Sequence, residues 1–164
     1  RIQKERKEII VYIFIIAVVT VIIDIVFLKF FHVSQVSGLS NYPTLNDGDY
    51  MLETSLYSDI KVGDFITAEP KNLTDEDGNQ LIVVKRVIAV GGDKLEVKNG
   101  KLYVNEVEDT YGVNGKYSKD FSITVPEDCY YVMGDNRKYS VDSRYFGYIN
   151  KDEILGKVIF PVTK

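Results

Sequence analysis

The sequence is poor in the residues on which most hydrolytic and metal sites depend: its 164 residues include one histidine, His32, and one cysteine, Cys129. One histidine can form neither an H-E-x-x-H helix nor a zinc site built from several histidines. A Ser-His-Asp triad would have to use His32, which directly follows the longest apolar run, so we interpret it as an interfacial residue. A single cysteine excludes an intrachain disulfide, and the strand-like setting of Cys129 predicts a buried structural thiol. We expect no metal ion and no cofactor.

The charge balance gives no reason to expect a nucleic-acid partner. The formal net charge is −4, and lysines and arginines are spread along the chain without a basic stripe. Beyond the apolar N-terminal segment about 130 residues remain, enough for one domain with a core of its own.

Residues 9–31 form an apolar run long enough to cross a bilayer, because about 20 helical residues span its ~30 Å hydrocarbon core. Residues 1–8 carry four cations and two anions. The positive-inside rule therefore predicts a cytoplasmic N-terminus at 1–8, a transmembrane signal anchor at 9–31 and an extracytoplasmic domain at 32–164. Asp24 lies toward the outer end of the run, and we interpret it as interfacial.

Two other interpretations of the apolar run compete with an anchor. A cleaved signal peptide has a shorter apolar region followed by a small-x-small site, whereas bulky residues follow here. A buried core helix would show a polar face, and this run has none. The pattern therefore favours an uncleaved anchor.

Most of the remaining chain has the pattern of short strands, with apolar runs or alternations bounded by glycine and aspartate. The fold class predicted is mainly β: a transmembrane helix followed by an antiparallel β-sheet domain. The predicted strands are Tyr50–Glu53, Phe65–Ala68, Leu81–Val90, Phe121–Val125 and Cys129–Met133.

Two further segments complete the β pattern. Leu95–Asn105 alternates on both sides of Asn99-Gly100, which is the strongest short-range signal for a hairpin. Asn150–Gly156 predicts a single capped helical turn, and Lys157–Val162 a closing strand.

Pro70–Gln80 is polar and rich in turn residues. Asp75, Asp77 and Asn79 imitate part of a calcium loop, but the distal glutamate and the flanking helices are missing. We predict a solvated hairpin tip.

Three stretches contain the residues that could perform chemistry: Val36–Leu45 (VSGLSNYPTL), Leu81–Asp93 (LIVVKRVIAVGGD) and Gly134–Gly147 (GDNRKYSVDSRYFG). The first places Ser40 in a bend just after the apolar run. By itself this means little, because serine in a Gly/Asn/Pro segment is usually turn chemistry.

Lys85 is the candidate base, since peptide hydrolysis without histidine or metal needs another proton acceptor. A lysine can serve when burial lowers its pKa by several units from about 10.4. Strand alternation directs Lys85 and Arg86 to opposite faces, so an inward Lys85 could take the proton of Ser40. The alternative is a solvated lysine on an edge strand, and this segment alone favours that alternative.

The third stretch changes this balance. Asp142 and Arg144 flank Ser143 at a spacing that suits a supporting ion pair, and Ser140 could orient Lys85 through a hydrogen bond. A crowded surface loop could show the same composition by chance.

Taken together, the three stretches resemble the boxes of type I signal peptidases, and the resemblance extends over nearly the whole chain. The first is similar to Ser-Met-x-Pro-Thr-Leu, and the other two are similar to the family's lysine box and terminal box. The matching positions are Ser40 to Leu45, Gly48-Asp49, Lys85-Arg86, Gly92-Asp93, Gly134 to Arg137, Ser140 and Asp142 to Arg144.

The resemblance implies a role for each matching position. Ser40 would be the nucleophile and Lys85 the general base, with Ser140 orienting the lysine and Asp142 and Arg144 supporting the site. Gly38 would be a further supporting position; it has no hydroxyl, so the oxyanion hole would consist of backbone N–H groups, including that of Ser40. Substrate contacts would come from Asn41, Tyr42, Pro43 and Val83.

Asn41 departs from the family pattern, which has methionine after the nucleophile. The departure leaves the dyad intact and puts ordinary substrate preference in doubt. A buried amide must either face a polar substrate segment or find a local hydrogen bond and narrow the cleft.

The function implied is a membrane-bound serine endopeptidase that removes signal peptides from exported proteins after a small-x-small motif through an acyl-enzyme. The substrate would lie extended beside strands near the dyad. The expected partners are preproteins, pilin precursors among them, and the lipid bilayer, in a Gram-positive bacterium. Two alternatives stay open: a pilus-associated homologue dedicated to pilins, and a self-cleaving Ser-Lys repressor-type peptidase, against which the anchor argues.

Overall fold

The computed structural model describes residues 2–115, 117 and 119–162, and the chain divides into two compact units, Arg1–His32 and Val33–Lys164. Residues 1, 116, 118, 163 and 164, including the ends of the predicted segments 1–8 and 32–164, lie outside the described residues.

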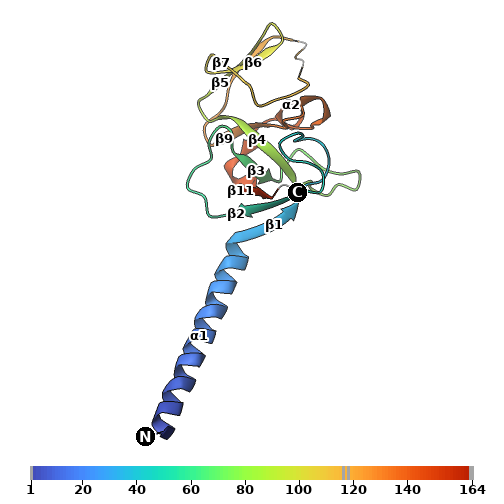
Figure 1. The fold of residues 1–164 in the computed structure, drawn as a ribbon. Coiled ribbons are helices and arrows are strands. Elements are labelled where there is room, and N and C mark those ends of the chain that lie inside the picture. The colour runs from blue at the N-terminus through green and yellow to red at the C-terminus, as the bar shows by residue number, and fades with distance from the viewer. Residues whose placement is uncertain (1, 116, 118, 163–164) are drawn as a thin grey trace. The chain divides into compact units, whose positions relative to one another are not determined.

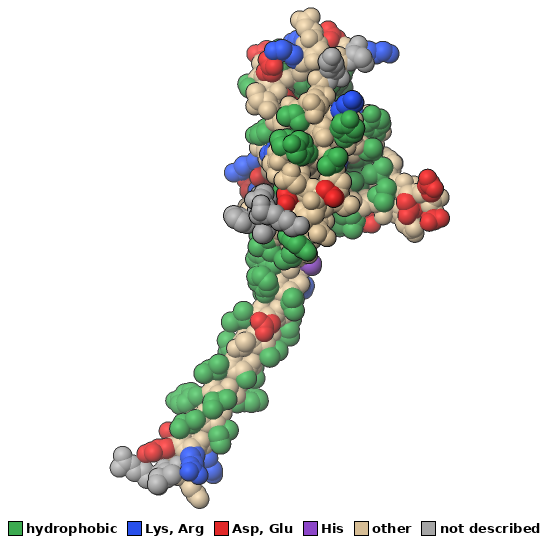
Figure 2. All heavy atoms as spheres, turned by 45° about the vertical axis from the view of Figure 1, so that its right-hand side comes forward, with side chains coloured by type: hydrophobic (Ala, Val, Ile, Leu, Met, Phe, Trp, Pro, Cys, Tyr) green, Lys and Arg blue, Asp and Glu red, His purple; other side chains and the backbone are tan. Residues whose placement is uncertain are grey.

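The first unit consists of helix α1, Ile2–Phe30, whose stretch Glu5–Phe30 is long and apolar enough to cross a membrane. Its large apolar side chains from Ile9 to Leu28 are exposed within the chain, and Figure 2 shows those on one face. A helix that is hydrophobic all round needs an apolar environment. The most apolar part of Glu5–Phe30 is not buried against the rest of the chain. The helix begins earlier than the apolar run, since the charged segment before the run is helical too.

The second unit is built from two antiparallel sheets (Figure 1). The larger, seven-stranded within the described residues, has the order β1-β2-β11-β3-β4-β9-β10. Its strands are β1 Phe31–Gln35, β2 Tyr50–Thr54, β3 Phe65–Ala68, β4 Val83–Val90, β9 Cys129–Met133, β10 Ile149–Asn150 and β11 Ile154–Val162.

The smaller sheet has four strands among the described residues, in the order β7-β6-β5-β8. The chain enters this sheet directly after β4 of the larger sheet. Asn99 and Gly100 both have positive φ, the conformation of the tight hairpin turn that joins β5 to β6. Its strands are β5 Lys94–Lys98, β6 Lys101–Val104, β7 Val107–Glu108 and β8 Phe121–Thr124.

Short helical turns complete the larger sheet. Helix α2, Ser143–Phe146, and the 3₁₀ turn η1, Arg137–Tyr139, lie between β9 and β10. The 3₁₀ turn η2, Lys151–Glu153, precedes β11 and is closed by a capping box between Asn150 and Glu153.

The core has three clusters of buried apolar side chains. One joins the smaller sheet to β4 and β9, one lies under α2 and β10, and one surrounds Leu45. The Leu45 cluster holds the loop of the first stretch against β2 and β3.

The predicted β architecture is confirmed, with corrections at several boundaries. β4 begins at Val83, two residues later than predicted, and the helical turn ends at Glu153, so β11 starts at Ile154. The sequence analysis did not predict the short elements β7, β10 and α2, which have two to four residues each. Cys129 is a buried free thiol on β9, as predicted, and residues 75–80 form the predicted turn, closed by a Thr74–Gln80 bridge.

Candidate active site

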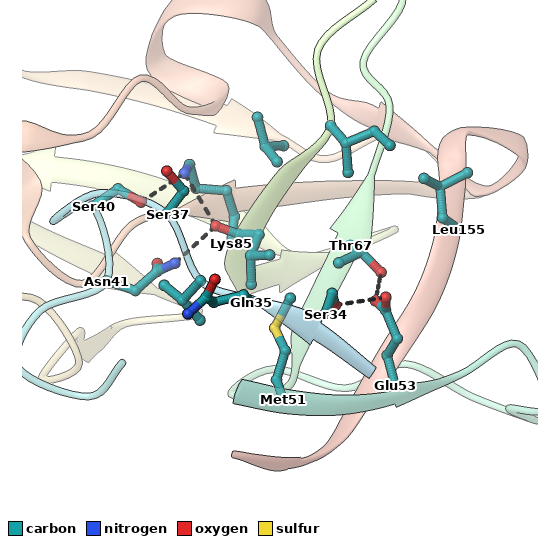
Figure 3. Close-up of a pocket in the computed structure, with 14 residues that line it drawn as sticks. Ser34, Gln35, Ser37, Ser40, Asn41, Met51, Glu53, Thr67, Lys85 and Leu155 are labelled. Atoms are coloured by element: carbon teal, nitrogen blue, oxygen red, sulfur yellow. Dashed lines mark hydrogen bonds between the residues drawn. The ribbon is translucent and has the colours of Figure 1, made fainter. Parts of the chain in front are cut away.

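Ser40 and Lys85 are in direct contact in the second unit (Figure 3). Lys85 Nζ donates hydrogen bonds to Ser40 Oγ and to the carbonyl oxygen of Val84, both at 3.0 Å. A nucleophile and a base within 3.2 Å form the arrangement that activates a hydroxyl for attack. The pair predicted from sequence is therefore brought together.

Strand β4 places Lys85 at this position. Lys85 pairs with Ile66 of β3, and the adjacent Arg86, which is opposite Phe65, has its side chain on the other face of the sheet. The Lys85 residue is only 5% exposed. The alternative of a solvated lysine on an edge strand is therefore wrong, because the lysine points into the protein.

Burial changes the acid–base chemistry of this lysine. Desolvation lowers the pKa of Lys85 from 10.5 to about 8, and the negative charge of Asp142 opposes the shift. With a pKa of about 8, this lysine is a free amine in about a tenth of the molecules at pH 7 and in about half at pH 8, and the free amine is the form that a general base requires.

Ser40 is fixed by contacts with the third stretch. The backbone N–H of Asn136 donates a hydrogen bond to the Ser40 carbonyl at 3.0 Å, and the side-chain Nδ2 of Asn136 donates one to the Leu39 carbonyl at 3.1 Å. Gly134 makes this approach possible, since a Cβ there would lie 2.3 Å from both Ser40 O and Ser140 Oγ. Glycine at 134 is thus a steric requirement of the site.

An ion pair that the sequence analysis missed joins all three stretches. Arg86 binds Asp135 through two hydrogen bonds, Nε to Oδ1 at 2.8 Å and Nη2 to Oδ2 at 2.7 Å. Thr44 Oγ1 donates to Asp135 Oδ2 at 2.5 Å. Arg86 also lies between the rings of Phe65 and Tyr111, with its Cζ 4.1 and 4.5 Å from their centroids. The sequence signal for this role was that Arg86 and Asp135 each belong to a matching stretch, Arg86 to the second and Asp135 to the third.

Asp142 and Arg144 form the ion pair predicted from their spacing. Arg144 Nε donates to Asp142 Oδ1 at 2.7 Å, and Arg144 Nη2 donates to the Arg137 carbonyl at 2.7 Å. Asp142 is fully buried, caps α2 and accepts a hydrogen bond from the Gly134 amide at 3.0 Å. The pair therefore fixes the loop that carries Gly134.

Ser140 has a different contact from the one predicted. Its Oγ accepts a hydrogen bond from the Gly134 amide at 3.2 Å. Among the described residues the acceptors of Lys85 Nζ are Ser40 and Val84, and Ser140 is not one of them. Ser140 supports the backbone next to the dyad, and the predicted direct orientation of Lys85 stays a prediction.

Gly38 adopts a left-handed conformation, with φ of 88°, and its amide donates to Asp47 Oδ1 at 2.7 Å. That amide is therefore occupied by a carboxylate and is unsuitable as an oxyanion donor. Within the described part of the chain the Ser40 amide has no acceptor of its own. It remains the candidate donor that the sequence analysis named.

Asn41 is 1% exposed and uses the local hydrogen bond that was one of its two predicted alternatives. Its Nδ2 donates at 2.9 Å to the Val84 carbonyl, which also accepts from Lys85. Its Oδ1 is buried and has no hydrogen-bond partner among the described residues.

The dyad opens into a cleft of about 430 Å³ between two backbone segments, residues 34–37 and 82–85. Val83 and Asn41 line it, and their predicted contact with substrate stays a prediction. Tyr42 and Pro43 are exposed and are not among the described residues that line it, and their contact with substrate stays a prediction. The first half of β4 pairs with β3, while its pairing with β9 begins only at Arg86.

The free edge of β4 beside the cleft can therefore pair with an extended peptide. A nucleophile, a deprotonatable amine and an available backbone N–H at one end of such a groove suit acyl transfer from a peptide bond. Among the described residues no group of three or more metal-ligating side chains is gathered that could hold a metal ion.

Comparison with known proteins gives one family. The family model described as signal peptidase, peptidase S26, matches residues 6–163. Signal peptidase IB of Staphylococcus aureus strain COL is 34% identical, over 94% of this chain and 90% of the relative. Signal peptidase I of Bacillus caldolyticus is 35% identical, over 76% and 75%. The crystal structure of a signal peptidase I from Enterococcus faecalis V583 is 30% identical and covers 63% of this chain and 98% of its own, with a TM-score of 0.49.

Proposed function

The chain belongs to the signal peptidase family, peptidase S26, and from this premise we propose that it is a membrane-anchored Ser-Lys endopeptidase that removes signal peptides from exported preproteins. The observation that carries the mechanism is the 3.0 Å contact between Lys85 Nζ and Ser40 Oγ. The cut would lie directly after a small-x-small motif in the preprotein.

The reaction begins when Lys85 is a free amine. Its Nζ then accepts the Ser40 proton across the same contact, while Oγ attacks the carbonyl carbon of the scissile bond. The developing oxyanion accepts a hydrogen bond from the Ser40 amide. The Lys85 ammonium then gives its proton to the leaving nitrogen, the C–N bond breaks, and an ester to Ser40 remains.

The second half of the reaction uses the same base. Lys85, again a free amine, takes a proton from water, which attacks the ester carbonyl. Breakdown of the second tetrahedral intermediate returns the proton to Ser40 and releases the signal peptide. Asp142 and Arg144 support this cycle by holding the loop that contains Gly134 against Ser40.

Substrate would bind as an added strand in the cleft. Residues 34–37 and 82–85 line its two sides, and the unpaired edge of β4 offers backbone groups to an extended peptide. Helix α1 would anchor the chain in the membrane, with residues 32–164 outside, which suits a substrate that is itself delivered in the bilayer.

Asn41 favours a second candidate, a pilus-dedicated enzyme of the same chemistry. Its buried amide occupies a position that the family gives to methionine, next to the nucleophile. A narrowed cleft would restrict cleavage to one kind of precursor.

The experiment that tests the proposed function uses the full chain in detergent micelles. It is incubated with a secretory preprotein, and mass spectrometry defines the new N-terminus. We expect one cut directly after the small-x-small motif, abolished in Ser40→Ala. Cleavage elsewhere, or cleavage by the Ser40→Ala variant, would refute the proposal.

A further inference from the structure

The cleft contains a carboxylate that the proposed chemistry does not use. Glu53, on β2, lines the cleft together with Ser34 of β1 and Thr67 of β3. Figure 3 shows these three side chains grouped at one end of the cleft and Ser40 at the other. Glu53 is half-buried, so its carboxylate is partly withdrawn from water yet open to the cleft.

The Glu53 carboxylate is held in place by two hydroxyl groups. Ser34 Oγ donates to Oε1 at 2.9 Å, and Thr67 Oγ1 donates to Oε2. Thr67 Oγ1 also lies 3.2 Å from the Gly156 carbonyl. Because a hydroxyl has one proton, Ser34 and Thr67 supply two protons for three acceptors. The group therefore has acceptor capacity for a further donor.

Protein cations do not supply that donor. Among the described residues no lysine or arginine forms an ion pair with Glu53. Lys157, on the neighbouring strand β11, pairs instead with Asp64 at 2.7 Å. Lys85, at the other end of the cleft, donates to Ser40 and Val84. Among the described residues the Glu53 carboxylate thus has hydroxyl partners and no paired cation.

The backbone of β11 leaves room for this arrangement. A Cβ on Gly156 would lie 3.3 Å from Thr67 Oγ1 and 3.5 Å from Glu53 Oε2. The glycine keeps the two side chains in their places without crowding them.

We propose that Glu53 is a specificity-determining residue that binds the ammonium or guanidinium group of a lysine or arginine in the substrate peptide. This deepens the proposed function and rests on it. A cation supplies several N–H donors to a carboxylate that still has acceptor capacity, and charge-assisted hydrogen bonds are the strong ones. If this end of the cleft were a small apolar pocket and not a carboxylate with its hydroxyl partners, it would favour alanine-sized side chains.

The test measures kcat/KM of the full chain in micelles on a peptide series. A reference peptide carries alanine at the positions on both sides of the scissile bond. Each variant peptide replaces one of these alanines with lysine, at successive positions along the series. We expect one position at which lysine raises kcat/KM about tenfold, mainly through KM, since the contact binds ground state and transition state alike. Glutamate at the same position should lower it.

Substitution of Glu53 provides the control. In Glu53→Gln, which keeps the shape but replaces one accepting oxygen with an N–H donor, so that one of the two hydroxyls must turn, the ratio of kcat/KM between the lysine peptide and the reference peptide should fall to about one. In Glu53→Lys the preference should reverse toward glutamate. Equal kcat/KM for lysine and alanine at every position, or a lysine preference that survives in Glu53→Gln, would overturn the assignment.

The two proposals fail in different ways. If the reference peptide is not cut, the proposed peptidase function fails. If it is cut in a Ser40-dependent manner without any charge preference, only the Glu53 assignment fails. Circular dichroism of both Glu53 variants establishes that they fold, and Ser58→Ala, an exposed serine outside the cleft, serves as a variant expected to change nothing.

Discussion

Lys85 Nζ donates a hydrogen bond to Ser40 Oγ over 3.0 Å, although 45 positions separate the two residues in the chain. The buried amine has a pKa of about 8, and the serine beside it lines the cleft.

Ser40→Ala and Lys85→Ala should each lower kcat/KM by roughly a thousandfold or more, because each removes half of one proton-transfer pair. The double variant should lose about as much as either single variant. Cleavage of a preprotein is the measurement, with circular dichroism as evidence of folding. Lys138→Ala, which removes an exposed lysine of the third stretch, is the matched control and should retain activity. Near-normal turnover of Lys85→Ala would contradict the dyad.

The activity should rise with pH through about 8, since the free amine of Lys85 is the reactive form. The folded-state pKa is lower than the unfolded value of about 10.5, so between these two values the unfolded chain binds more protons. Stability should therefore rise with pH across this window. Below it the lysine is protonated in both states, and the cost of burying its charge is present in full.

Urea unfolding at several pH values measures this effect on stability. Lys85→Met, which has no titrating group, should lose the Lys85 contribution to the slope between pH 8 and 10.5. An unchanged slope in that variant would show that another group is responsible.

Arg86→Met should lower the free energy of unfolding by about 3–5 kcal/mol, because it leaves the fully buried Asp135 carboxylate without its cation. Cleavage should fall as well, since the pair joins the three stretches that form the site. The control is Lys61→Met, which breaks the exposed Lys61–Asp59 pair. Urea midpoints that move equally in the two variants would refute this role of the buried pair.

Asn41→Met should broaden cleavage toward ordinary secretory signal peptides and leave the pH dependence nearly unchanged. The substitution removes a fixed amide, whose Oδ1 has no hydrogen-bond partner in the described part of the chain, and supplies a flexible apolar wall. Val84 O keeps its hydrogen bond from Lys85. The measurement is the ratio of kcat/KM on a secretory signal peptide to that on a pilin precursor. Identical ratios in both forms would place specificity outside Asn41.

A protease added outside intact cells should cut the chain within residues 75–80 and leave residues 1–8 protected. The first segment is an exposed turn, and the second is the charged end of an apolar helix long enough to cross a membrane. Labelled cysteines introduced at Gln80 and at Lys7 give an independent measurement. Labelling of position 7 from outside would reverse the proposed topology.

The sequence determined the features that arise from neighbouring residues. The apolar run predicted a long helix, because its length and the absence of a polar face do not depend on the rest of the fold. Asn99-Gly100 predicted its hairpin, since both positions need positive φ. The spacing of Asp142 and Arg144 predicted their ion pair, which is formed within one short loop.

Features that depend on distant residues could not be obtained in this way. The burial that lowers the pKa of Lys85 results from packing around β4, and the segment that contains Lys85 favoured a solvated lysine when taken by itself. The Gly38 N–H donates a hydrogen bond to the Asp47 carboxylate, and Ser140 Oγ accepts one from the Gly134 N–H. The spacing of these residues in the sequence identified neither partner. Elements as short as β10 lack a periodicity of their own, so pairing with β9 alone defines them.

The same division explains the chemistry. Serine and lysine are common in loops and strands, and their types were readable from the chain. Only the tertiary structure removed water from Lys85, brought its Nζ to Ser40 Oγ and placed the Glu53 carboxylate in the cleft with no paired cation among the described residues. Desolvation and charge pairing are properties of the space around a side chain.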